Sequence, residues 1–379
     1  MLIKTELAND PSVNRLIQAW NQLYTPNFDA LALSQDPSLC IKLAEAVSPA
    51  GRAKTAAKLN KQIIELRCEL ATIQTNALYA YMQDVMDQQE VRKFAQASIK
   101  IYTLLVDLYE QNLLTTMSVF DAVRSPNERS STTPSGSAES SSDIQRLAEA
   151  LEPMLLEFQQ KHTQSKDWRA LGFMTTQLNF CNQWLLDKLT PLEQVLFDPY
   201  LKFIEEHVAH PWQRVCAAAA TGTVVNSSIG QIVEQMIPLA EEIAEAAYQS
   251  LTQLLPNHRS RRGALRDLGV SHSCIRDLKM FQAYLWLCVL EGSMASVEQE
   301  LLGLCVMVLP GVGVKWEMME LWTQVLATEL LRHIKPSQQP YIRTYTTSMH
   351  QIFLKARTQL DTSLSRSVTE LSMRGMALK

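Results

Sequence analysis

Glycine is scarce in this sequence, and the glycine-rich loops of common cofactor sites are missing. The 379 residues include 12 glycines, less than half the average usage of roughly 7%. Folds built on many tight βα turns or hairpins need more glycine, so the scarcity favours long helices with few connections. No Gly-x-Gly-x-x-Gly follows a strand pattern and no Gly-x-x-x-x-Gly-Lys occurs, so the usual phosphate cradles are absent. We therefore expect no enzyme activity and no cofactor.

The cysteines also lack the spacing of metal or redox sites. There are seven cysteines, an odd number, and none forms a Cys-x-x-Cys pair. Most stand among apolar neighbours, which favours buried, reduced thiols. The first six residues carry both Lys4 and Glu6 and have no apolar core, so a secretory signal is not expected and we predict a cytoplasmic protein.

Long hydrophobic runs are missing as well. Val215 to Val233 has no charged residue but contains several polar ones, and the more apolar Met280 to Leu290 is only 11 residues long. A membrane-spanning helix needs about 20 predominantly apolar residues. Both segments are better interpreted as parts of a buried core, and we expect no membrane partner.

No strong excess of positive charge marks the whole chain. Lysine and arginine number 35 against 39 acidic residues, a net charge of −4. Binding to nucleic acid would therefore depend on a local basic patch.

A serine- and proline-rich stretch, residues 125–143, interrupts the chain. It has eight serines, two prolines and no large apolar residue, so it cannot offset its ordering entropy by burial. We predict a flexible linker between an N-terminal helical region, residues 1–124, and a C-terminal helical domain, residues 144–379. A long loop within one helical domain is the alternative.

Helical periodicity dominates both sides of this stretch. Upstream, apolar residues recur at alternating steps of four and three, at Leu59, Ile63, Leu66, Leu70, Ile73 and Ala77. This narrow seam favours an internal bundle, because soluble bundles use the same pattern, and a dimer interface is the alternative. Downstream, Thr190-Pro191-Leu192-Glu193 predicts the start of a helix, with a capping hydroxyl, proline at the first position and glutamate at the third. The fold class predicted is all-α, a multi-helix bundle.

The segment from residue 257 to 278 carries the most specific pattern. Leu265 and Leu268, then Gly269 and Ser271, then Ile275 follow the order of a helix-turn-helix: apolar closure, a turn glycine, a capping hydroxyl and an inward apolar face. We therefore predict a helix-turn-helix near residues 260–279. The alternative is an ordinary αα-hairpin with no role in binding.

Local charge supports DNA binding at this segment. Residues 258–279 contain six lysines and arginines and two acidic residues, a local net charge of +4. Arginines before and within the first helix would hold phosphates, and Arg276 on the second helix could read guanine. The candidate DNA-binding residues are Arg259, Arg261, Arg262, Arg266, Ser271, His272, Ser273, Arg276 and Lys279.

The residues 261–271, Arg-Arg-Gly-Ala-Leu-Arg-Asp-Leu-Gly-Val-Ser, together with the apolar run 281–290, resemble cyanobacterial heterocyst-differentiation regulators of the HetZ type. The resemblance covers this C-terminal segment. It implies a transcription factor that acts on developmental promoters through the arginine-rich helix-turn-helix.

One cluster of metal-ligand residue types stands elsewhere. Glu205, Glu206, His207 and His210 share one stretch, but no Glu-x-x-His pair of the di-iron kind occurs. We interpret them as solvated residues near a helix end and expect no metal site.

Two functions follow from these observations. The first is a sequence-specific DNA-binding transcriptional regulator whose partners are double-stranded DNA and regulatory proteins, acting as a homodimer because one short recognition helix specifies too few bases. The second is a helical adaptor that binds proteins without touching DNA. Exposure of Arg261, Arg262, His272 and Arg276 on one convex edge would favour DNA, whereas inward pairing with carboxylates would favour a scaffolding role.

Overall fold

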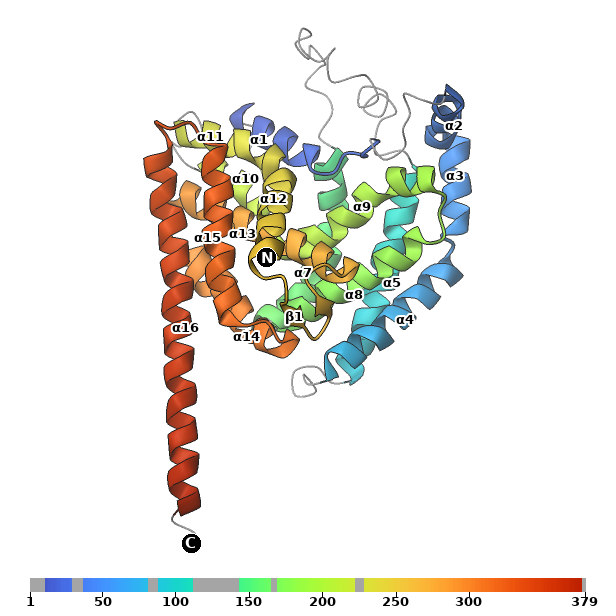
Figure 1. Ribbon diagram of the computed structural model, residues 1–379. Helices are drawn as coiled ribbons and strands as arrows, with labels where there is room; N and C mark the ends of the chain where they lie inside the picture. The colour runs from blue at the N-terminus through green and yellow to red at the C-terminus, as the bar shows by residue number, and fades with distance from the viewer. Residues whose placement is uncertain are drawn as a thin grey trace. The chain divides into compact units, whose positions relative to one another are not determined.

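The computed structural model describes residues 11–28, 37–80, 88–111, 143–164, 169–221 and 228–376. In these ranges the regular structure is almost entirely helical, and strands are limited to a short antiparallel pair (Figure 1). The all-α class predicted from the sequence is confirmed.

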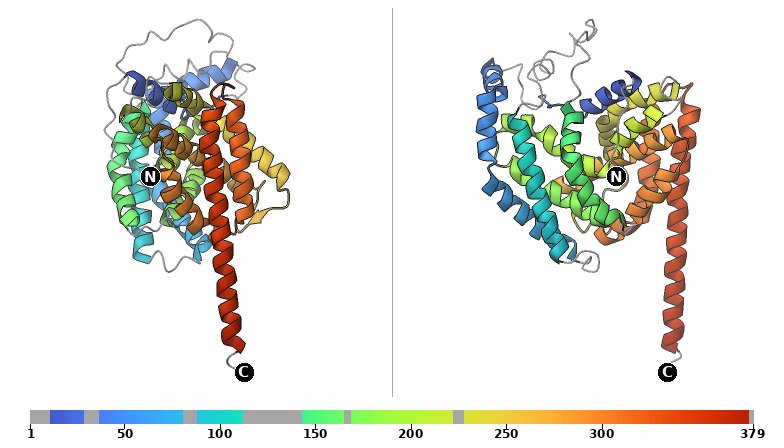
Figure 2. Two further views of the ribbon diagram at one scale, coloured as in Figure 1. Left: turned by 90° about the vertical axis from the view of Figure 1, so that its left-hand side faces the viewer. Right: turned by 180° about the vertical axis from the view of Figure 1, so that it is seen from behind.

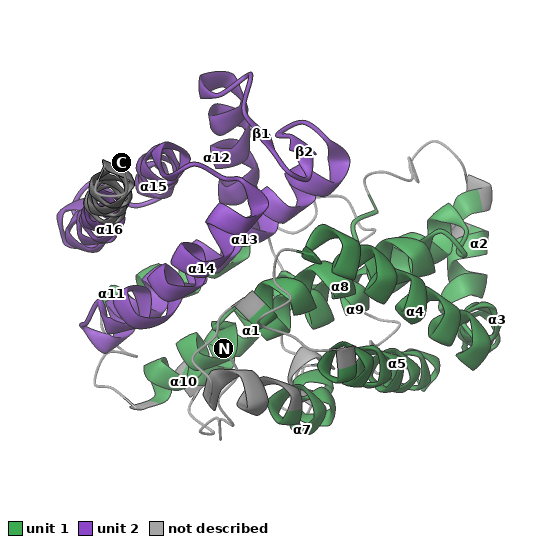
Figure 3. Ribbon diagram, turned by 90° about the horizontal axis from the view of Figure 1, so that it is seen from below, with its two compact units in different colours: residues 1–238 green, residues 239–379 purple. Residues whose placement is uncertain are grey.

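The chain forms two compact units, residues 1–238 and 239–379 (Figure 3). This division differs from the expected boundary at residues 125–143. Of that stretch only Asp143 lies within the described residues, and it begins a helix. Helices before and after the stretch pack together in the first unit, and the rest of the predicted linker lies outside the described residues, so its role stays a prediction.

Unit 1 is a bundle of ten helices within the described residues. They are α1 (Pro11–Gln22), α2 (Pro37–Val47), α3 (Pro49–Lys58), α4 (Lys61–Leu78), α5 (Gln88–Glu110), α7 (Asp143–Gln164), α8 (Arg169–Leu186), α9 (Pro191–Ala209), α10 (Trp212–Thr221) and α11 (Ser228–Met236). A 3₁₀ turn, η4 (Ile237–Leu239), spans the junction with unit 2. Among these helices α8 is central, because it packs extensively against both α4 and α9.

The face that α4 buries is not the one its apolar seam suggests. Leu66, Leu70 and Ile73 are 48%, 38% and 66% exposed. The buried face instead carries Cys68 and Ala71, together with Ile64, Thr72 and Thr75. Small side chains let two helices approach closely, and the Cys68 sulfur lies 3.8 Å from that of Cys181 on α8. The seam is therefore not an internal packing surface from Leu66 onward, although Leu59 at its start is buried, and its use as a dimer interface stays a prediction.

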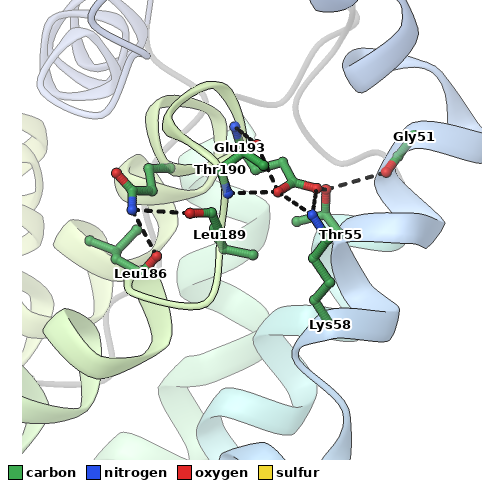
Figure 4. A network of polar contacts seen from close by, with 8 residues as sticks. Gly51, Thr55, Lys58, Leu186, Leu189, Thr190 and Glu193 are labelled. Carbon is green, nitrogen blue, oxygen red and sulfur yellow. Dashed lines mark hydrogen bonds and ion pairs between the residues drawn. The ribbon is translucent and has the colours of Figure 1, made fainter.

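The predicted start of α9 is confirmed in detail. Thr190 is the N-cap, Pro191 is the first helical residue, and Glu193 completes a capping box. The Glu193 carboxylate also receives hydrogen bonds of 2.8 and 2.6 Å from the Lys58 ammonium and one of 3.2 Å from the Thr55 hydroxyl (Figure 4). The cap thus joins α9 to α3 as well as starting the helix.

The far end of α9 is buried, contrary to the solvated helix end expected there. Glu205, Glu206, His207 and His210 are only 2–3% exposed. The His207 ring stacks on Phe203 and Trp20, with ring centroids 4.6 and 6.1 Å away. Burial lowers the pKa of His207 to about 3, so this imidazole is neutral at physiological pH.

Unit 2 is a smaller bundle of helices. Within the described residues it contains α12 (Ala240–Leu254), the strands β1 (Arg259–Ser260) and β2 (Gly263–Ala264), α13 (Leu268–Glu291), a π-helical turn η5 (Val297–Leu301), α14 (Leu302–Val312), α15 (Trp316–Arg332) and α16 (Gln339–Met376). The first half of α16 packs against α15, and its second half continues past the end of that helix (Figure 2).

The core of unit 2 is built around α13. Met280 to Leu290 is buried over its whole length, as predicted from its composition, and a helix that is apolar on all sides is stable only when it is surrounded. The flanking α12 and α16 supply that cover. Across the part of the chain that the structure describes, no helix combines the length and apolarity needed to cross a bilayer.

The predicted thiol chemistry also agrees with the structure. All six cysteines with described side chains are buried and carry no disulfide. Burial raises the pKa of Cys216 to about 12 and that of Cys288 to about 11, so these thiols are protonated and unreactive at neutral pH.

Candidate nucleic-acid interface

The helix-turn-helix predicted near residues 260–279 is wrong in its first helix and its turn. Residues 255–267 form an irregular connection that contains β1 and β2, and Gly269 is the second residue of α13. The physical reason is composition: residues 257–266 contain four arginines and a single large apolar residue, Leu265, so a helix there would have no apolar face to bury. Only the second predicted helix exists, as the start of α13.

The connection forms a small β-hairpin, which we call the basic hairpin (residues 259–264). Arg259 pairs with Ala264 and Ser260 with Gly263, which leaves Arg261 and Arg262 at the turn. The Ser260 hydroxyl accepts a 3.1 Å hydrogen bond from the Arg262 N–H. Gly263 has a φ of +131°, a conformation that L side chains rarely adopt. The turn therefore presents two adjacent arginines.

Contacts from three helices hold the basic hairpin and the residues that follow it. The Arg261 N–H donates a 2.9 Å bond to the Val312 carbonyl at the end of α14. The Tyr248 hydroxyl on α12 donates a 2.8 Å bond to the Leu265 carbonyl. The Arg262 guanidinium donates a 2.7 Å bond to the Ser273 hydroxyl on α13. A short hairpin alone is marginally stable in water, so these tertiary bonds explain why it forms.

The nine predicted DNA-binding residues divide into three groups. Exposed residues are Arg259, Arg261, Arg266 and His272, half-buried ones are Arg262 and Ser271, and buried ones are Ser273, Arg276 and Lys279. The six that reach the surface come from the hairpin, its C-terminal flank and the first turn of α13.

The buried group does not fit the role predicted for it. Arg276 is 8% exposed and its guanidinium makes hydrogen bonds of 2.9 and 2.7 Å to the Asp277 carboxylate. Lys279 is 3% exposed and its ammonium lies 2.8 Å from the Glu241 carboxylate on α12. A side chain that reads a base edge must reach into a groove, so this geometry presents neither residue to DNA.

A further cation that the sequence pattern missed lies near the hairpin. Lys315 is exposed. The pKa of His258, the residue before the hairpin, is lowered by its burial and, to a smaller extent, by the positive charge of Lys315. The adjacent segment reaches the hairpin turn, since a Cβ built on Gly313 would lie 3.4 Å from the Arg261 side chain. Lys315 is more than 40 residues away in sequence, and no local pattern links the two. We call Arg259, Arg261, Arg262, Arg266 and Lys315 the basic surface.

Chemically, the basic surface suits an anion with several charges. Guanidinium groups bind phosphate and carboxylate oxygens with charge-assisted hydrogen bonds. Among the described residues no group of three or more His, Cys, Asp or Glu side chains is placed to hold a metal ion.

Comparisons with protein-family models, with curated proteins and with solved structures find no match to this chain.

Proposed function

We propose that this chain binds double-stranded DNA through the basic surface and acts as a transcriptional regulator. The observation that carries the proposal is the exposure of Arg259, Arg261 and Arg266 on a connection that is anchored by hydrogen bonds to three helices. Preorganised cations lose little entropy when phosphates bind. The corner between the hairpin and α13 is also accessible, because Leu268 is 83% exposed.

The proposed contacts are mainly with the phosphate backbone. Arg276, the residue expected to read guanine, is buried and paired with Asp277. Sequence preference would then come from the shape and deformability of the duplex, and from any reach of the exposed His272.

The experiment is a titration of a fluorescein-labelled 30-base-pair duplex at 50 to 300 mM KCl, followed by fluorescence anisotropy. Each phosphate neutralised contributes about −0.9 to the slope of log K against log salt. We expect Arg259→Ala and Arg261→Ala each to weaken binding and to reduce the slope by about one. Arg343→Ala is the matched control, since Arg343 is an exposed arginine of the same unit on α16.

Two results would overturn DNA binding through the basic surface. One is the absence of duplex binding at 50 mM KCl. The other is a salt slope that is the same in the wild type, Arg261→Ala and Arg343→Ala.

The resemblance to HetZ-type regulators would make developmental promoters the targets. A regulator of this kind gains affinity and specificity by pairing two half-sites, and the exposed seam of α4 is our proposed surface for a homodimer. Promoter occupancy in cells during heterocyst differentiation would test the assignment of the targets.

The second candidate is a helical adaptor, favoured by one specific observation. Leu254 and Leu268, at the two ends of the connection that carries the hairpin, are 56% and 83% exposed. Apolar residues beside cations suit an acidic partner helix. If duplex binding were absent while Arg262→Ala weakened a protein complex, the adaptor would replace the regulator.

A further inference from the structure

Asp267 uses its side chain in an unusual way for a residue at a helix start. It occupies the N-cap of α13, with φ −69° and ψ 135°, yet its side chain makes no capping bond. An N-cap aspartate normally accepts a bond from the second or third N–H of its own helix. Here the Asp267 carboxylate accepts a 2.8 Å hydrogen bond from the Ala264 N–H instead, so the acceptor serves the hairpin.

A second bond joins the same two residues. The Asp267 N–H donates a 3.0 Å bond to the Ala264 carbonyl. Ala264 is the last residue of β2 and the register partner of Arg259. The pair of bonds therefore fixes the end of the strand that faces Arg259.

The glycine before this pair is explained by the same carboxylate. A Cβ added at Gly263 would lie 2.2 Å from the Asp267 Oδ2 atom, far inside van der Waals contact. Only a residue without a side chain lets the carboxylate approach the strand at this point. Gly263, one of only 12 glycines in the chain, therefore lies at a position where the Asp267 contact requires glycine.

We propose that Asp267 is the positioning residue of the basic surface: its carboxylate holds β2, and through β2 it holds Arg259 and the turn residues Arg261 and Arg262 in the orientation that binds phosphate. The proposal rests on the proposed function. The negative charge of Asp267 by itself opposes DNA binding, because a carboxylate within a cationic surface repels phosphate. If Asp267 had no positioning role, removing its charge would strengthen DNA binding.

Two variants separate charge from position. Asp267→Asn and Asp267→Ala remove the same negative charge, but only asparagine keeps a side-chain oxygen that can accept the Ala264 N–H. Electrostatics alone predicts that both variants bind DNA more tightly than the wild type. Positioning predicts that Asp267→Asn binds equally or more tightly, and that Asp267→Ala binds more weakly.

The experiment measures duplex affinity by anisotropy at 100 mM KCl and the exchange rate of the Ala264 amide hydrogen by NMR. We expect Asp267→Ala to lose about fivefold in affinity and to exchange the Ala264 hydrogen at least tenfold faster, since a hydrogen bond to a charged group is lost. Asp267→Asn should keep both the duplex affinity and the Ala264 exchange rate close to those of the wild type. Glu298→Ala, which removes an exposed carboxylate from η5, is the control for charge.

The outcomes distinguish this proposal from the proposed function. Equal affinity of Asp267→Ala and Asp267→Asn, or an unchanged Ala264 exchange rate in Asp267→Ala, overturns the positioning role. Absence of wild-type binding at 50 mM KCl overturns DNA binding, and with it the role of Asp267 in DNA binding. The exchange measurement in that case still decides whether the carboxylate holds the hairpin, because it needs no ligand.

Discussion

The Arg276 guanidinium donates two hydrogen bonds, 2.9 and 2.7 Å long, to one carboxylate oxygen of its neighbour Asp277. The Arg276 side chain is 9% exposed and that of Asp277 is 37% exposed, so the pair lies at the edge of the unit 2 core with the arginine inside. An ion pair of this kind holds its cation away from solvent, and removal of one partner leaves the other without compensation.

This arrangement predicts a loss of stability for Arg276→Ala with no change in DNA recognition. We expect the free energy of unfolding to fall by about 1 to 3 kcal/mol, because buried packing and charge-assisted bonds are lost together. Urea unfolding followed by circular dichroism gives the stability, and anisotropy with duplexes of varied sequence gives the base preference. A relaxed preference at one base position, with stability intact, would return Arg276 to the role of a groove-reading residue.

A second prediction concerns the polar network between α3 and α9 (Figure 4). Burial favours a raised pKa for Glu193, but hydrogen bonds from Lys58 and from the Thr190 N–H and hydroxyl outweigh it and lower the pKa below the ordinary value of 4.5. A lowered carboxyl pKa contributes stability above the unfolded pKa, and this contribution is lost as the pH falls through the folded value.

Glu193→Gln should therefore destabilise the protein by about 1 to 3 kcal/mol at pH 7, as expected for bonds to a charged group. The difference from the wild type should shrink below pH 4.5. Urea unfolding at pH 7, 5 and 3.5 measures both. Glu298→Gln is the control, since Glu298 is exposed. A difference that is independent of pH would contradict the role of the ionised carboxylate.

The start of α9 could be predicted from the sequence because every signal for it is local. Thr190, Pro191 and Glu193 act on one another within a single turn, and their effect needs no distant partner. The burial of Met280 to Leu290 was predictable for a related reason, since an apolar run of that length has no stable exposed form.

The basic hairpin could not be predicted in the same way. Gly269 and Ser271 match a helix-turn-helix in local spacing, but a bond from the Arg261 N–H to Val312 holds the chain before them in another form. That contact links residues about 50 positions apart, and local pattern carries no information about it. Lys315 belongs to the basic surface for the same reason, because the segment that follows α14 lies beside His258 and the hairpin.

The face that α4 buries could not be predicted from the sequence for a different reason. Its seam of large residues and its face of small ones repeat with the same helical period, so periodicity identifies a helix without saying which face is inside. Close packing against α8 selected the small face. The buried end of α9 shows the same limit, because charged residues such as Glu206 and His207 were expected in solvent.

A third prediction follows from the neutral His207. Its pKa, about 3 in the folded protein, lies well below its ordinary value of 6.5 because the ring is buried. Between these two values the unfolded chain binds more protons than the folded one, so stability rises with pH in that window and falls on acidification. One such group contributes up to about 1.4 kcal/mol per pH unit.

His207→Phe removes the titration and keeps an aromatic ring between Phe203 and Trp20. When the pH falls from 6.5 to 5.5, we expect the free energy of unfolding of the variant to decrease by about 1 kcal/mol less than that of the wild type. Urea unfolding at the two values tests this, with His272→Phe as a control at an exposed histidine. Identical pH dependence in His207→Phe and the wild type would contradict the argument.

The last prediction tests the seam of α4 as a dimer interface. Leu66, Leu70 and Ile73 place exposed apolar side chains along one face of the helix, and a charge in such a face opposes its burial against a second copy. We expect the wild type to sediment above its monomer mass of 42.8 kDa at micromolar concentration. Ile73→Glu should return it to the monomer mass.

The matched control is Ile41→Glu, since Ile41 is an isoleucine on α2 with a similar exposure of 73%. It adds the same charge outside the seam and should leave the mass of the wild type unchanged. A regulator that binds paired half-sites would also lose affinity for a palindromic duplex in Ile73→Glu, because linked binding of two subunits adds avidity. A wild type that stays at the monomer mass at every concentration would exclude the seam as a homodimer surface.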